Sequence, residues 1–123
     1  MKMLKPLKAT LAACLIAAFA STAYANSHTE QGMKAYLKSD FKTALTHFKK
    51  AEQQGDLDAK FMLAGMYLQG QGVKQNERTA LELLRKNCIA HHHTSCSMLA
   101  DLIEQKCQAG NQAACEMLKK RNK

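Results

Sequence analysis

A repeat with a period of 36 residues is the feature that most constrains what this chain can fold into. The segment Asp40–Lys50 aligns with Asn76–Lys86, and Met62–Ala64 aligns with Met98–Ala100 at the same offset. Apolar residues in these segments follow the i, i+3, i+4, i+7 spacing of one helix face, and periods of this length are typical of helical hairpins. A single hairpin cannot bury its own apolar face, so neighbouring hairpins must stack. We therefore predict an all-α fold, an α/α superhelix that forms a short solenoid of stacked antiparallel helix hairpins.

Residues at the ends of the periodic segments predict where the helices begin and end. The expected helices cover about 28–38, 40–53, 57–69, 76–89, 94–107 and 111–121. Short polar side chains can cap the N–H groups of a first turn, and the expected caps are Asp40, Asp56, Asn76, Thr94 and Asn111. Gly55 and Gly110 suit the left-handed position that follows a last turn. The expected core consists of Tyr36, Leu37, Phe41, Leu45, Phe48, Phe61, Leu63, Met66, Tyr67, Leu81, Leu84, Leu99, Leu102, Ile103 and Leu118.

The start of the chain has the composition of a cleavable export signal. Three lysines within the first eight residues precede an apolar stretch from Ala9 to Ala20, and the small-x-small sequence Ala23-Tyr24-Ala25 follows. This stretch is shorter than the roughly twenty apolar residues that span a membrane. We predict a signal peptide over residues 1–25 and a helical repeat domain over residues 26–123, with weaker alternative cuts after Ala20 and Ala23.

Export defines the expected compartment and excludes some partners. Leu11–Cys14 is similar to a lipoprotein box, but the apolar stretch continues past Cys14 to Ala20, which disfavours lipidation. We expect a periplasmic or secreted protein that meets the membrane only through its signal peptide. The formal net charge of +8 would suit a nucleic acid partner, but an exported protein does not meet nucleic acid in the cytosol. We therefore expect no nucleic acid partner.

One segment resembles a known family of helical repeats. The pattern is Ala59-x-x-x-Leu63-x-x-Met66-Tyr67-x-x-Gly70-x-Gly72-Val73, followed by Thr79-Ala80-Leu81. It is similar to the Sel-one-like repeat (SLR), a relative of the tetratricopeptide repeat in which a Gly-x-Gly-Val loop lengthens the hairpin. One unit, about 57–90, matches well, the first unit is more tetratricopeptide-like, and the last is truncated. The resemblance implies an α/α superhelix that acts as a protein-interaction scaffold.

Four cysteines remain beyond the signal, and the repeat indicates their partners. Four cysteines allow three pairings. Offsets of 36 and 55 place Cys88 and Cys107 on one position of the first repeat, and Cys96 and Cys115 on another. Each pair then spans a tight corner between two helices, where Cα atoms can approach to the ~5–6 Å of a disulfide. We predict the disulfides Cys88–Cys96 and Cys107–Cys115, which would persist outside the cytosol.

The spacing of these cysteines also raises an enzymatic alternative. It resembles the cysteine-rich secreted branch of the SLR family, and that resemblance implies a weak β-lactamase or penicillin-binding activity. Ser39-x-x-Lys42 has the S-x-x-K form of penicillin-recognising serine enzymes, but the sequence has no S-D-N or K-T-G element. Asp40 already serves as a helix cap. We predict no catalytic residue.

Three consecutive histidines, His91, His92 and His93, lie between Cys88 and Cys96 and offer a rival metal site. Consecutive side chains point in different directions, and a structural zinc site prefers separated ligand pairs. An oxidising compartment would also consume the thiolates as disulfides. We expect a polar corner loop and no cofactor, and we keep the three histidines as alternative metal ligands.

The favoured function is that of a binding module. The first helices of the hairpins are expected to line a concave surface that engages a protein or peptide. Its candidate contact residues are Tyr36, Tyr67, Gln69 and Gln71. Nothing in the sequence requires a dimer, so we expect a monomer.

Overall fold

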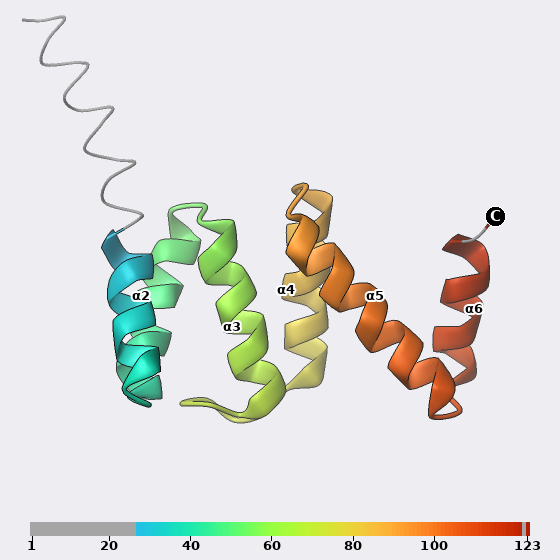
Figure 1. Cartoon of the computed structure of the whole chain (residues 1–123), viewed down its shortest axis with the longest axis horizontal. Coiled ribbons are helices and arrows are strands. Elements are labelled where there is room, and N and C mark those ends of the chain that lie inside the picture. The colour runs from blue at the N-terminus through green and yellow to red at the C-terminus, as the bar shows by residue number, and fades with distance from the viewer. Residues whose placement is uncertain (1–26, 122) are drawn as a thin grey trace, which may run out of the picture. The chain divides into compact units, whose positions relative to one another are not determined.

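Helices account for all the regular secondary structure of the described chain (Figure 1). The computed structural model describes residues 27–121 and 123, so the predicted signal peptide, Cys14 included, lies outside the described residues. A helix over residues 27–37 is followed by α2 (Phe41–Gln53), α3 (Leu57–Gln69), α4 (Glu77–Ile89), α5 (His93–Gln108) and α6 (Gln112–Arg121). The bounds of α2 to α6 differ from the predicted ones by at most one residue. The predicted all-α helical-repeat fold is confirmed.

The chain divides into two compact units, Met1–Ala59 and Lys60–Lys123. The described part of the N-terminal unit contains the helix 27–37, α2 and the first turn of α3. The C-terminal unit contains the rest of α3 and the helices α4, α5 and α6, with α5 packed against both α4 and α6. Each unit has buried residues of its own.

Phe48 of α2 is the centre of the core in the N-terminal unit. Its side chain is fully buried and lies against Gly32 of the helix 27–37, where an added Cβ would stand 2.7 Å from the ring. Ala35, Ala44 and Ala51 are buried as well. The close approach of the Phe48 ring to Gly32 therefore joins these two helices.

Small residues also dominate the centre of the C-terminal unit. Ala64, Ala80 and Leu84 form a fully buried cluster contributed by α3 and α4. The partly buried residues packed against this cluster are Phe61, Tyr67, Leu68, Leu83, Met98, Leu99 and Leu102. Alanines allow the helix backbones to approach closely, and the larger side chains cover the contact from the outside.

Of the fifteen residues predicted for the core, four are buried, ten are half buried and one is exposed. Phe48, Leu63, Met66 and Leu84 are buried. The prediction for Leu37 is wrong, because 77% of this residue is exposed. Leu37 follows the buried Ala35 by two positions, which is about 200° around a helix, so it faces away from the core.

The tight corners between helices share one construction. Each corner ends with a residue that has a positive φ. The side chain of the residue after it accepts a hydrogen bond from a backbone N–H of the next helix, three positions after the accepting residue. The four pairs are Ser39–Asp40, Gly55–Asp56, His91–His92 and Gly110–Asn111. The caps predicted at Asp40, Asp56 and Asn111 are thus confirmed, as is Asn76 at the start of α4.

The predicted cap at Thr94 is wrong. The side chain of His92 caps α5 instead, because its Nδ1 accepts a hydrogen bond from Ser95 N–H at 3.3 Å. The helix consequently begins at His93, one residue before the predicted start. An imidazole nitrogen here replaces the usual carboxylate or amide oxygen of a cap.

The connection between α3 and α4 is longer than the other corners. Gly70 and Gly72 both have positive φ, of 68° and 67°. The loop is held at its base by Asn76 N–H, which donates to Tyr67 O at 2.9 Å, and by Gln75 Nε2, which donates to Leu68 O at 2.7 Å. These bonds fix the entry into α4.

In the described part of the chain, no helix has both the length and the apolar character needed to cross a membrane.

We expect Gly32→Ala to destabilise the protein. Overpacking of a core costs about 1–3 kcal/mol, which outweighs the roughly 1 kcal/mol that alanine gains over glycine inside a helix. Urea unfolding followed by circular dichroism should show a lower midpoint.

Gly65→Ala on α3 is the matched control, because an added Cβ there meets no neighbouring atom within 4 Å. This variant should raise the midpoint, since only the gain in helix propensity remains. Equal stabilisation by both changes would contradict the contact between Phe48 and Gly32.

Candidate functional site

An apolar groove in the C-terminal unit is lined by residues of α4, α5 and α6. Its apolar residues are Leu81, Leu99, Ile103 and Met117, and its volume is about 470 Å³. The first three are half buried, whereas 57% of Met117 is exposed. A concave apolar surface that is exposed to solvent is a common feature of interaction sites. This groove is the main candidate for a binding site.

Three charged side chains of α4, Arg78, Glu82 and Arg85, border the groove. Glu82 already forms an ion pair with Lys86, at 3.1 Å. The Lys86 ammonium group, with smaller contributions from Arg85 and Arg78, lowers the pKa of the Glu82 carboxyl from its ordinary value. Two guanidinium groups beside one carboxylate that a lysine already neutralises leave this border positively charged.

A second hollow, of about 290 Å³, has residues of the α3 end, the α4 start and the α5 end in its wall. The charged side chains in this wall, Glu77 and Lys106, form an ion pair with each other. Gln75, also in the wall, donates its side-chain hydrogen bond to Leu68 O. Because these polar groups have partners within the chain, this hollow offers fewer contacts to a ligand than the groove does.

The four residues predicted to contact a partner do not line the groove. Tyr67 is half buried and packs against the alanine-rich cluster, Gln69 is exposed at the end of α3, and Gln71 is half buried in the loop that follows. Tyr36 belongs to the N-terminal unit, where its ring lies edge-on to Phe41 with centroids 5.3 Å apart. A role for these four residues in binding stays a prediction.

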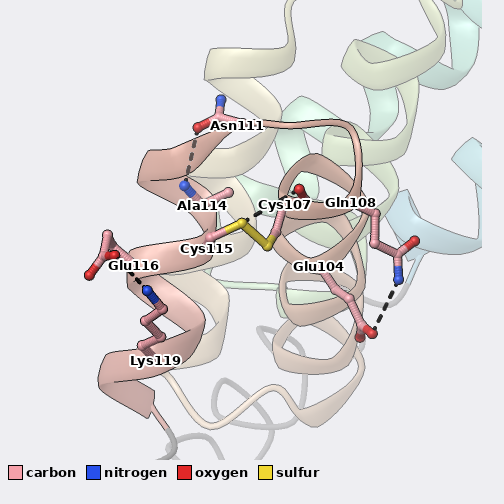
Figure 2. Close-up of a disulfide and its surroundings, with 8 residues drawn as sticks. All are labelled: Glu104, Cys107, Gln108, Asn111, Ala114, Cys115, Glu116 and Lys119. Atoms are coloured by element: carbon pink, nitrogen blue, oxygen red, sulfur yellow. Dashed lines mark hydrogen bonds and ion pairs between the residues drawn. A yellow bond between two sulfur atoms is a disulfide. The ribbon is translucent and has the colours of Figure 1, made fainter.

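The cysteines of the two predicted pairs lie at disulfide distance. The sulfur atoms of Cys88 and Cys96 are 2.01 Å apart, and those of Cys107 and Cys115 are 1.95 Å apart. In both pairs the Cα atoms are 4.7 Å apart. Figure 2 shows the second pair joining the end of α5 to α6, beside the cap formed by Asn111 and Ala114 N–H. Each pair therefore spans one tight helix corner.

A buried polar network lies in the corner between α4 and α5. Asn87 Nδ2 donates to Ser95 Oγ at 3.1 Å, and both residues are fully buried. Ser95 Oγ and the His92 Nδ1 are 2.7 Å apart. Since Nδ1 also accepts from Ser95 N–H, the neutral ring carries its proton on Nε2. The His92 ring lies beside Phe61, with centroids 5.7 Å apart.

This network gives the histidine run a structural role. His91 takes the left-handed position, with a φ of 65°, and His92 caps the next helix. His93 is the first residue of α5 and is exposed. Across residues 27–121 and 123, no three or more His, Cys, Asp or Glu side chains are grouped so that they could hold a metal ion.

Ser39, the first residue of the S-x-x-K match, also has a place in a corner. Its φ is 61°, and its N–H donates to Tyr36 O at 2.9 Å. Asp40, the next residue, caps α2 through Thr43 N–H, and this hydrogen bonding lowers the pKa of the Asp40 carboxyl. The turn thus explains the position of Ser39.

Sequence reasoning missed both the groove and the polar network. A signal for the corner was present, because the 36-residue offset places Gly55–Asp56 on His91–His92. No comparable signal marks the groove. The spacing of Arg78, Glu82 and Arg85 is typical of a solvated helix face, and the inclusion of Met117 depends on how α6 packs against α5.

Comparison with known proteins adds one finding. The family model described as Sel1 repeat matches residues 20–56 and again residues 57–87, together more than half of the chain. The second match covers α3, the glycine loop and nearly all of α4. The four cysteines of the two pairs follow the second match and lie outside both. No curated protein matches the chain.

We expect Ser95→Ala to lower the free energy of unfolding by about 1–3 kcal/mol, because it leaves the buried Asn87 amide without its serine acceptor. Ser97→Ala is the control, since Ser97 is exposed on the same helix and should change stability by less than about 0.5 kcal/mol. Urea unfolding of both variants measures the difference. Equal effects would argue against a structural role for the network.

Proposed function

The chain belongs to the Sel1 repeat family, and from that premise we propose that it is an exported, disulfide-braced scaffold that binds a protein or peptide partner. Repeats of this family typically mediate protein–protein interaction. The observation that carries the proposal is the apolar groove of α4, α5 and α6 with its positively charged border. The scaffold acts as a monomer and needs no cofactor.

The groove favours a particular class of partner. Its apolar residues suit the hydrophobic stripe of an amphipathic helix, a recurring way in which helical proteins recognise peptides. Arg78 and Arg85 at its border suit acidic side chains on either side of that stripe, because opposite charges steer association and select among partners. The partner segment is therefore an amphipathic helix with acidic flanks.

Two features support export. The lysine-rich start, the apolar stretch and the Ala23-Tyr24-Ala25 sequence have the order of a cleavable signal. Cysteine pairs at disulfide distance suit an oxidising compartment, because disulfides are rare in the cytosol. The cysteine spacing supports membership of the cysteine-rich secreted branch of the family. The protein then works in the periplasm or outside the cell.

The groove is tested with two labelled model peptides. Both carry leucines at i, i+3, i+4 and i+7, and the remaining face carries glutamates in one and lysines in the other. The glutamate peptide should bind at least about tenfold more tightly at low salt, because charge complementarity discriminates between them. Fluorescence anisotropy measures both affinities.

Matched variants locate the binding. Met117→Lys places a charge among the apolar residues of the groove and should weaken binding, whereas Ile89→Lys should not. Ile89 is 70% exposed and lies outside the groove. The pair Arg78→Glu and Arg85→Glu should reverse the preference between the peptides. Equal affinity for both peptides, or equal effects of the two lysine variants, would refute the groove as the binding site.

The disulfides are tested one pair at a time. Replacing Cys88 and Cys96 together by Ser should lower the free energy of unfolding by about 2–3 kcal/mol, the chain-entropy value for so short a loop. The Cys107 and Cys115 pair should behave alike. Thermal unfolding with and without reductant measures the effect, and a variant that lacks both pairs should no longer respond to reductant. Unchanged stability would contradict disulfide bracing.

A further inference from the structure

Two histidines from different helices meet in the N-terminal unit. His28 belongs to the helix 27–37 and His47 to α2, and their Nδ1 atoms are 3.3 Å apart. The ring centroids are 5.6 Å apart, and both residues are half buried. Their partial exposure leaves the pair open to an ion from solvent.

The separation of the two nitrogens matches one coordination geometry. Zinc binds an imidazole nitrogen at about 2.0–2.1 Å and prefers a tetrahedral site, in which two ligand nitrogens lie about 3.3–3.4 Å from each other. With the same bond lengths, an octahedral ion would bring two adjacent nitrogens to about 2.9 Å. The observed distance of 3.3 Å between the Nδ1 atoms of His28 and His47 fits the tetrahedral arrangement.

We propose that His28 and His47 bind one Zn(II) ion through their Nδ1 atoms, and that this ion joins the helix 27–37 to α2. Neutral imidazole is a common zinc ligand. Two protein ligands leave two tetrahedral positions, which water molecules fill. The proposal depends on neither export nor the groove, because both histidines belong to the N-terminal unit.

Binding replaces a weak contact between the two rings. Without the ion, one Nδ1–H donates to the other Nδ1, but the distance of 3.3 Å is longer than the roughly 2.9–3.0 Å of a common hydrogen bond. When the ion binds, this proton passes to solvent and the Nε2 of the same ring takes up one proton, so both rings stay neutral. Both Nδ1 lone pairs then bind zinc, and no atom is oxidised or reduced.

Contacts on both sides of His28 hold its helix in place. The hydroxyl of Thr29, the next residue, donates to the Asp56 carboxylate, and Asp56 also caps α3. Gly32, about one helical turn after His28, lies against the buried ring of Phe48. Because these contacts fix the two helices relative to each other, an ion would meet ligands that are already in position, which favours binding.

An ion at this position would brace the unit that lacks the cysteine pairs. Both pairs belong to the C-terminal unit, and residues 27–59 contain no cysteine. A ligand that binds only the folded form stabilises that form by mass action. We therefore expect zinc to slow amide hydrogen exchange in the helix 27–37 and in α2, but not in α6.

The test uses the purified chain without an affinity tag and with its cysteines oxidised. Zn(II) is titrated against a competing chelator, and thermal unfolding is followed with and without Zn(II). Co(II) serves as a spectroscopic substitute, because tetrahedral Co(II) absorbs visible light more strongly than octahedral hydrated Co(II). We expect one tightly bound Zn(II) per chain, a higher unfolding temperature with zinc and a tetrahedral Co(II) spectrum.

Three variants locate the ion. His28→Gln and His47→Gln each leave one imidazole and should weaken Zn(II) binding by at least about 100-fold, the lower end of the gain from joining two binding groups. The matched control, His91→Asn with His93→Asn, removes two exposed imidazoles of the other unit and should keep both the affinity and the spectrum. Circular dichroism without metal checks that each variant remains folded. The Co(II) spectrum and the amide exchange of the unmodified chain test the site without any substitution.

The results that overturn the proposal are equally specific. Unchanged Zn(II) affinity in His47→Gln would overturn it, because His28 or another group would then bind the ion alone. Loss of binding in the control that lacks His91 and His93 would place the ion at the histidine run instead. An octahedral Co(II) spectrum would overturn the tetrahedral assignment, and unchanged amide exchange in both helices would overturn the brace.

Discussion

Each tight reversal among the described residues depends on the same backbone interaction, in which a residue in left-handed conformation is followed by a side chain that caps the next helix. Glycine occupies the left-handed position in two corners, and serine and histidine occupy it in the other two. A non-glycine residue there costs about 1–2 kcal/mol. The hydrogen bonds that Ser95 makes with Asn87 and His92 lie at the histidine corner and offset this cost.

The corners bring short helices together around very little apolar volume. Half of the fully buried residues that the structure describes are alanines, and the large buried side chains are Phe48 in the N-terminal unit and Met66 and Leu84 in the C-terminal unit. A core of this size gives modest stability, and two of the tight corners also carry cysteine pairs at disulfide distance. It also leaves larger side chains such as Leu81, Leu99 and Ile103 half buried, where they form the groove rather than an interior.

The helices and the cysteine partners were predictable because they are local or periodic properties. Helix boundaries are marked by capping residues, glycines and the helical spacing of apolar residues, which all lie within a few residues of each boundary. The repeat then predicts that the corner of one unit recurs in the next. The errors at Leu37 and Thr94 have a different origin. Leu37 is apolar but faces away from Ala35 on its own helix, and Thr94 has the side chain of a cap but follows a histidine whose ring nitrogen already performs that task. Residue type alone does not distinguish such neighbours.

The sequence by itself determined the helical repeat, the positions of the helix ends, the cysteine pairs and the family, because each of these depends on spacing along the chain. Only the tertiary structure decided that His28 meets His47, that Asn87 and Ser95 are buried together, and that Arg78, Arg85 and Met117 border one groove. These juxtapositions depend on the rotation and packing of one helix against another. Because most residues at the helix contacts are small or only half buried, their positions along the sequence do not determine how the helices are rotated and packed against each other.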